Sequence, residues 1–111
     1  MILDAMKRHN LNVGVQEQGC GTLANFTVNA VNRKTIVNEG GIKVILDAMD
    51  KYREDGDVQE NSCGVLVNLA CDDDNKKTIA TEGGIKVILD AMKRHKKNEY
   101  ICRRTSSVTP S

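Results

Sequence analysis

Cysteine, histidine and aspartate are the residue types in this chain that could bind a metal ion or act as a nucleophile. The cysteines contain no C-x-x-C pair, which favours a reduced, intracellular protein over a zinc or dithiol site; they are Cys20, Cys63, Cys71 and Cys102. Cys20 and Cys63 occupy the same inward-facing position of two equivalent helices. Equivalent packed helices lie about 8–10 Å apart, too far for a disulfide. We therefore expect these two thiols to be small core residues.

Neither the histidines nor the acidic runs predict a catalytic site. His9 and His95 follow the apolar part of two predicted helices, so we expect them on the surface. The carboxylates at 72–74 are consecutive, whereas an EF-hand loop places its calcium ligands at alternate positions, so they are typical of a turn that caps a helix. The chain is predicted to be non-enzymatic, with no catalytic residue, no cofactor and no metal.

The elements that must position these residues repeat with a period of 43 residues. Residues 2–41 and 45–84 agree at 19 of 40 positions, and GGIKVILDAM occurs at 40–49 and again at 83–92. A fixed period of about 20–50 residues indicates a solenoid, in which each unit buries its apolar face by stacking on its neighbours.

The first half of one period predicts two helices separated by a glycine pair. Asn32 is the expected N-cap of a short polar helix, which ends at Gly40–Gly41 because glycine accepts the left-handed conformation of a helix C-terminus. A second helix follows from Ile42 to about Arg53. Its apolar residues share one face: Ile42, Ile45, Leu46 and Met49.

A third helix completes the period. Asp57 is the expected N-cap, with Glu60 three residues later as in a capping box, and the helix runs to about Ala70. Its predicted inner face comprises Val58, Ser62, Cys63, Leu66, Leu69 and Ala70.

These elements resemble the armadillo repeat family. The third helix reads VQEQGCGTLANFT at 15–27 and VQENSCGVLVNLA at 58–70, and NRKTIVNEGG and NKKTIATEGG begin two units. The resemblance covers about residues 1–98. It implies an all-α fold, an armadillo-type right-handed α-solenoid of three-helix repeats.

The resemblance also implies a concave groove, lined by the third helices, that binds an extended peptide or a partner protein. Asn25 and Asn68 match the family's asparagine that hydrogen-bonds the ligand backbone, since an amide supplies both a donor and an acceptor; capping of the helix end is the alternative role. By helical phase, the protein-binding groove is predicted to contain Glu17, Gln18, Gly21, Thr22, Asn25, Glu60, Asn61, Gly64, Val65 and Asn68.

Gly21 and Gly64 mark a departure from part of the family. Nuclear-import adaptors of this family carry a tryptophan at this position, which forms a slot for lysine side chains. The resemblance therefore does not extend to binding of a basic nuclear localisation signal. Two glycines at one phase indicate either close packing between repeats or close approach of a ligand backbone.

The ends of the repeat pattern predict self-association. The chain begins inside a second helix and ends after another, giving about two and a half repeats, whereas solenoids generally need three or more. The expected self-association faces are Ile2, Leu3, Met6, Ile85, Ile88, Leu89 and Met92. The sequence thus predicts a homo-oligomer, by end-to-end stacking or helix exchange, or a fragment of a longer array.

Composition and charge limit the kinds of partner that the chain is expected to bind. The net charge is +1 and 28% of residues are charged, so the overall balance does not require nucleic acid or an anionic membrane. The basic cluster at 93–97 and 103–104 lacks interleaved aromatic residues apart from Tyr100, which does not favour single-strand binding. No apolar run approaches the ~20 residues of a membrane span and no signal peptide is evident, so we expect a cytoplasmic or nuclear location.

The predicted organisation is one repeat domain, 1–104, followed by a disordered polar tail, 105–111. Within the domain we expect a partial repeat at 1–31, a full repeat at 32–74 and a partial repeat at 75–104. The predicted function is that of a protein-interaction scaffold, with a structural self-assembly module as the alternative.

Overall fold

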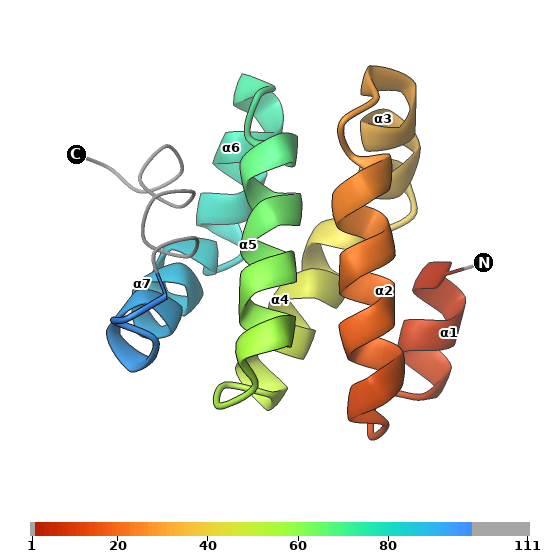
Figure 1. Ribbon diagram of the computed structural model, residues 1–111. Helices are drawn as coiled ribbons and strands as arrows, with labels where there is room; N and C mark the ends of the chain where they lie inside the picture. Colours follow the sequence, from red (N-terminus) through yellow and green to blue (C-terminus); the bar gives the residue numbers. More distant parts are fainter. Residues whose placement is uncertain (1, 99–111) are drawn as a thin grey trace.

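The computed structural model describes residues 2–98, and Met1 and residues 99–111 lie outside it. Residues 2–98 form seven helices and no strand, which confirms the all-α prediction (Figure 1). The helices are α1 (Ile2–Arg8), α2 (Val13–Phe26), α3 (Ala30–Asn38), α4 (Gly41–Lys51), α5 (Gly56–Leu69), α6 (Asp73–Thr81) and α7 (Gly84–Arg94). The predicted polar tail and the end of the predicted third unit, 99–104, fall outside the described residues.

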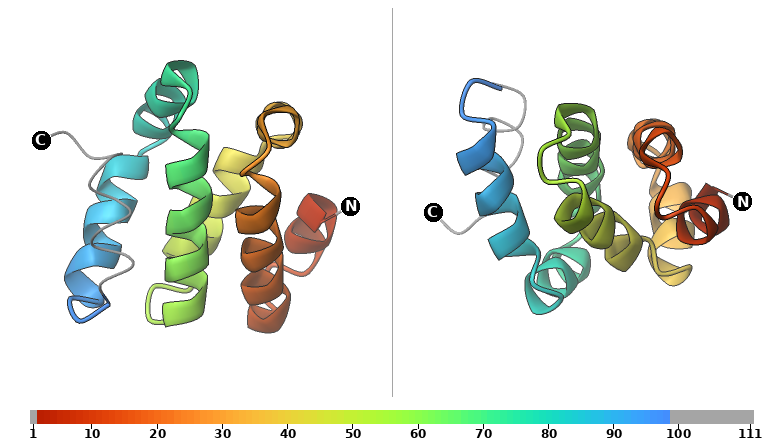
Figure 2. Two further views of the ribbon diagram at one scale, coloured as in Figure 1. Left: turned by 45° about the horizontal axis from the view of Figure 1, so that its top comes forward. Right: turned by 90° about the horizontal axis from the view of Figure 1, so that it is seen from below.

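The helices repeat with the same period as the sequence. The bounds of α5, α6 and α7 are those of α2, α3 and α4 moved by 43 residues, and α1 corresponds to the last seven residues of α4. The equivalent second helices α1, α4 and α7 and the equivalent third helices α2 and α5 lie side by side in successive units (Figure 2). The division at 32, 75 and 105 remains an expectation about where each unit begins.

Two predicted helix caps are wrong by two or three residues. The N-cap of α3 is Asn29, whose side chain accepts hydrogen bonds from the backbone of Val31 and Asn32, so Asn32 already lies inside the helix. The N-cap of α5 is Asp55, whose carboxylate accepts from Val58 N at 3.0 Å. In both cases an earlier Asx residue satisfies the free amides of the first turn.

Each residue of the glycine pair has a separate reason to be glycine. Gly40 and Gly83 have φ of 83° and 85°, in the left-handed region that other residues avoid. At Gly84, a Cβ atom would lie 2.4 Å from Ile79 Cγ2 and 2.6 Å from Ile79 O. The second glycine therefore lets the second helix start directly against the end of the first helix.

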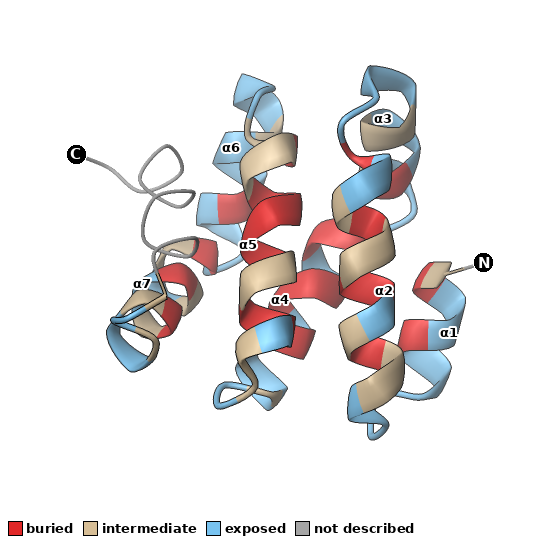
Figure 3. Cartoon of the chain, in the orientation of Figure 1, coloured by how far each residue is buried: buried red, intermediate tan, exposed pale blue. Residues whose placement is uncertain are grey.

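The core lies between the helices, on the faces that the periodicity predicts (Figure 3). The predicted apolar face of α4 is buried, and so are Cys20 and Cys63, as expected. Burial raises the pKa of the Cys20 thiol to about 11, although a hydrogen bond from Ser62 opposes this shift. Cys20 is therefore a neutral, unreactive thiol at physiological pH.

The predicted self-association faces are only partly exposed. Leu89 is exposed, whereas Ile2, Ile85 and Met92 are half-buried, and Leu3, Met6 and Ile88 are buried. The prediction is wrong for the buried side chains because α1 packs against α2 and α4, and α7 packs against α4 and α6.

A buried glutamine joins the second helix of each unit to the third. Gln59 Nε2 donates to Met49 O at 3.1 Å and to Tyr52 O at 2.8 Å, which are carbonyls at the C-terminus of α4. Gln16 makes the equivalent bonds at the end of α1. The last carbonyls of a helix have no partner within the helix, so this amide satisfies groups that burial would otherwise leave without one.

We expect Gln59→Met to lower the free energy of unfolding by about 2 kcal/mol, because two carbonyls lose their side-chain donor. Urea denaturation followed by circular dichroism measures the change. Gln18→Met, at an exposed position of α2, is the matched control and should change stability by less than about 0.5 kcal/mol. Equal effects of the two substitutions would contradict this role for Gln59.

Candidate protein-binding surface

The helices α2 and α5 form the surface that the sequence predicts as a groove. They lie side by side, with α4 behind them, and make the most extensive contact between elements (Figure 1). The predicted residues differ in accessibility. Gln18 and Asn25 are exposed, Gly64 and Val65 are buried, and the rest are half-buried: Glu17, Gly21, Thr22, Glu60, Asn61 and Asn68.

Gly64 and Val65 are corrections to the predicted groove. Val65 is 0% exposed. It shares its side of α5 with Ser62, whose hydroxyl donates to Cys20 Sγ at 3.2 Å on α2. Val65 is thus part of the packing between α2 and α5, and Gly64 is buried next to it.

Asn68 links two repeats instead of facing an open groove with its whole amide. Its Nδ2 donates to Ala24 O and to Thr27 Oγ1, both at 3.1 Å. Both N–H groups of the amide are therefore engaged by α2 and by the residue that caps its C-terminus. The Oδ1 atom is the part of this side chain that remains able to accept a hydrogen bond from a ligand.

Asn25 is the counterpart of Asn68 one period earlier, and its environment differs. It is exposed, and its side chain makes no hydrogen bond with any residue that the structure describes. The residues that bond Asn68, Ala24 and Thr27, have no described counterpart one period earlier. The donor and acceptor of Asn25 are both accessible.

Gly21 faces the neighbouring helix. A Cβ atom at this position would lie 3.4 Å from Asn61 Nδ2, an ordinary contact distance. The nearest atoms belong to α5, but a methyl group would fit at this distance, so packing against α5 does not require glycine at position 21.

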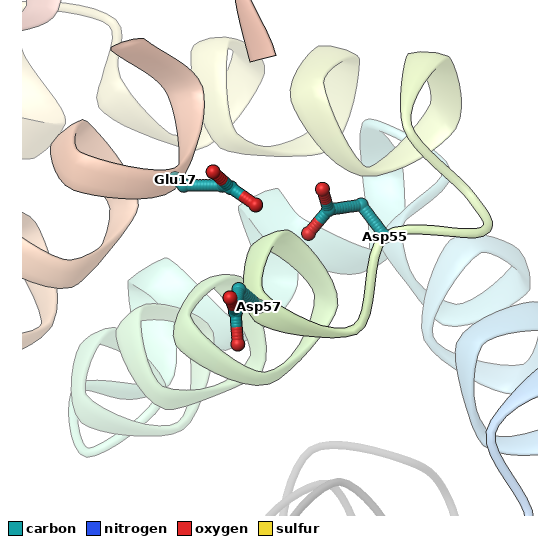
Figure 4. A group of neighbouring side chains, drawn as sticks. All are labelled: Glu17, Asp55 and Asp57. Carbon is teal, nitrogen blue, oxygen red and sulfur yellow. The ribbon is translucent and has the colours of Figure 1, made fainter. Parts of the chain in front are cut away.

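Three carboxylates from two repeats meet at one end of this surface. Glu17 on α2, Asp55 at the start of α5 and Asp57 in its first turn each offer an oxygen within 4.8 Å of the others (Figure 4). Among the described residues, these three carboxylates lie close enough together to hold a cation. One Asp55 oxygen is already bonded to Val58 N as the helix cap, and we interpret the group as an acidic patch.

The carboxylates of the acidic patch affect the pKa of Glu17. A hydrogen bond between Glu17 and Asp55 raises the pKa of Glu17, and loss of hydration and repulsion by Asp55 and Asp57 act in the same direction. The helical phase predicts Glu17 on the surface, but the sequence did not predict Asp55 and Asp57 beside it. The 43-residue period could have indicated this group, because the loop before α5 must pack near the first turn of α2.

The histidine position contributes to repeat packing. His95 Nε2 lies 2.9 Å from Arg53 O, and Tyr52, its counterpart, donates its hydroxyl to Asn10 O at 2.6 Å. A carbonyl only accepts, so Nε2 of His95 carries the proton in this contact. His9, the third residue of the set, is exposed as predicted.

The basic residues after α7 include one paired side chain. Arg94 forms ion pairs with Glu54 of the preceding unit and with Asp90 one turn before it. Lys93, Lys96 and Lys97 are exposed, and the predicted remainder of this cluster, 103–104, lies outside the described residues. No helix among residues 2–98 has the length and apolar character needed to cross a membrane.

Comparison with known proteins places one segment in a family. Residues 29–71 match the family model described as the armadillo/beta-catenin-like repeat. The chain is also 45% identical over 54 residues to protein aardvark of Dictyostelium discoideum, an alignment that covers 40% of this chain and 7% of that protein. The chain therefore spans a small part of the relative that it matches. No solved structure matches significantly.

We expect Glu17→Gln to stabilise the fold at pH 7. The pKa of Glu17 is raised in the folded protein, so wild-type stability falls as the pH rises and this carboxyl ionises beside two others. The stabilisation should disappear below about pH 4, where glutamate is protonated in the unfolded chain as well. Thermal unfolding of both proteins between pH 3 and pH 8 measures this, and a pH-independent difference would contradict the explanation.

Proposed function

Because residues 29–71 match the armadillo/beta-catenin-like repeat, we propose that this chain is a scaffold that binds an extended segment of a partner protein across α2 and α5. Armadillo repeats are generally protein-interaction modules and typically do not carry out catalysis. The observation that carries the proposal is the accessible amide of Asn25, which has no hydrogen-bonding partner within the described chain. An extended peptide offers alternating carbonyl and amide groups that such a side chain can bind.

The two asparagines support different contacts with such a ligand. Asn25 presents a donor and an acceptor, whereas Asn68 presents its acceptor, since both of its N–H groups bond to the preceding repeat. A bound segment would therefore pair a complete peptide group with Asn25. At Asn68 it would donate an N–H or a basic side chain.

The charge of the surface favours a partner with basic residues. Glu17, Asp55 and Asp57 lie together at one end of it, and Glu60 is on the same helix as Asp57. The hydrogen bond with Asp55 is the first cause of the raised pKa of Glu17, and loss of hydration and repulsion by Asp55 and Asp57 add to it; a nearby cationic side chain would relieve the repulsion. We therefore infer that the ligand carries lysine or arginine near the acidic patch.

The test uses fluorescein-labelled ten-residue peptides of three kinds: lysine-containing, neutral and glutamate-containing. We expect the lysine-containing peptides to bind most tightly. Asp57→Lys should weaken their binding by about three- to tenfold, because it replaces an attractive charge by a repulsive one. Fluorescence anisotropy gives the dissociation constants.

The matched control is Asp73→Lys. Asp73 occupies the first turn of α6 as Asp57 occupies that of α5, so both changes place a cation at a helix N-terminus. Asp73 is not part of the acidic patch, and its substitution should leave peptide affinity unchanged. Equal losses in the two variants, or no preference for basic peptides, would contradict the proposal.

Self-association is a second candidate function, favoured by apolar side chains at the two ends of the helix array. Leu89 on α7 is half-exposed, although its counterpart Leu46 is buried, and Phe26 is half-exposed, although its counterpart Leu69 is fully buried. A small apolar cavity of about 150 Å³ beside Phe26 includes Ile2 in its lining. Unburied faces of this kind stabilise a repeat array when another unit covers them.

Light scattering after size exclusion tests this second candidate. Between about 5 and 200 µM, the mass of the wild-type protein should rise above that of one chain, because association buries the apolar ends. A mass of one chain at every concentration would overturn self-association and leave the peptide-binding proposal unaffected.

A further inference from the structure

Exposure of an apolar side chain has two different causes in this repeat array. The large hydrophobic residues with exposed side chains are Leu11, Val13, Phe26, Val28, Val31 and Leu89. Val31 is 73% exposed, and its counterpart Asp74 in the next unit is exposed as well. The position of Val31 thus faces solvent whether or not a repeat precedes it.

Leu89 is exposed for the other reason. Its counterparts Leu3 and Leu46 are 2% and 5% exposed, whereas Leu89 is 51% exposed. The three side chains occupy the same position of equivalent helices. Each of the first two helices has a following second helix packed against it, α4 against α1 and α7 against α4. No described helix follows α7 in this way.

The opposite end shows the complementary pattern on α1. Ala48 and Ala91 are buried on α4 and α7, at 4% and 1% exposure, and each of these helices has a preceding second helix against it. Ala5 is their counterpart on α1, and it is exposed. Ala5 therefore marks the face of α1 that a preceding second helix would cover.

The position of His9, Tyr52 and His95 also marks α1 as the helix without a preceding neighbour, here by a missing hydrogen bond. Tyr52 bonds to Asn10 O of the preceding unit, and His95 lies 2.9 Å from Arg53 O. The carbonyl acceptor belongs to the same position in both units. His9 is exposed and makes no such contact among the described residues.

We propose that α7 of one copy of this chain packs against α1 of a second copy, in the geometry that α4 adopts against α7. Leu89 would cover Ala5 of the second copy, and His9 of the second copy would donate to the carbonyl of Lys96. The second copy is the occupant because α1 occupies the position of the last seven residues of α4, and all seven of its residues, ILDAMKR, recur at 88–94 in α7. The contact continues the observed series α1, α4, α7.

This contact joins two different faces and is therefore heterologous. After pairing, one copy retains a free α1 face and the other retains a free α7 face, so the contact propagates into chains or rings instead of stopping at a dimer. The inference rests on the second candidate function, self-association, and specifies which faces meet.

The charges at this contact differ from those inside the chain in one respect. Arg94 of α7 pairs with Glu54 of the preceding unit. The corresponding residues of two copies are Arg8 and Lys97, which have like charge. The contact between copies should therefore be weaker at low ionic strength, because salt screens exposed charges.

Two substitutions at exposed positions test the pairing without disturbing the folded chain. Ala5→Glu blocks the α1 face and Leu89→Glu blocks the α7 face. By light scattering at 100 µM, each variant alone should be a monomer. An equimolar mixture should form dimers and nothing larger, because one unblocked α7 face meets one unblocked α1 face. Val31→Glu is the matched control and should associate like the wild-type protein.

The outcomes separate this inference from self-association in general. A wild-type protein that is monomeric at every concentration overturns both. A wild-type protein that associates while either single variant still forms dimers, or while the mixture stays monomeric, overturns the heterologous contact alone. The double variant Ala5→Glu, Leu89→Glu should remain monomeric at every concentration.

A gain of association provides an independent test. Lys97→Glu restores between copies the charge pair that Glu54 and Arg94 form within the chain. The association constant should rise about two- to tenfold at low ionic strength and less in high salt. Lys34→Glu, at an exposed position of α3, should leave it unchanged. An equal effect of both variants would overturn the pairing of Lys97 with Arg8.

Discussion

The buried amide of Gln59 is the interaction on which the repeat unit depends. It bonds to two carbonyls at the end of α4 and so connects the direction of α4 to that of α5. Gln16 does the same for α1 and α2. Hydrophobic burial is non-directional, and an aliphatic core of this composition permits several helix orientations. A buried polar group must find its partners, and this requirement selects one orientation in each unit.

Contacts between units follow the same logic with different residues. Asn68 donates to Ala24 and Thr27 across the repeat boundary, and Tyr52 and His95 reach carbonyls of the preceding unit. These bonds set the register between units, while the apolar faces of the second helices contribute the larger share of the stabilisation. The N–H groups that are engaged in this way are not available to a ligand, so stacking and the proposed recognition compete for the donors of the asparagine position.

The surface proposed for binding is a consequence of this competition. Where a second helix has a described second helix on both sides, as α4 has, its apolar side chains such as Leu46 are buried, and Asn68 in the same unit bonds to the unit before it. At the two ends the same sequence positions are exposed, as for Leu89 and Asn25. The acidic patch arises in a third way, because stacking brings Glu17 next to Asp55 and Asp57 although their repulsion opposes it.

The sequence by itself determined the period, the three-helix unit and the apolar faces, because all three are local patterns of hydrophobicity and glycine. Only the tertiary structure decided which copy of each position is exposed, since burial depends on the neighbouring unit and not on the residue. Val65 and Leu3 were placed on surfaces for this reason, and Asn68 was assigned to a ligand although its amide bonds to α2. Asp55 could not be found beside Glu17 from either segment alone, because their distance is set by the rotation between repeats.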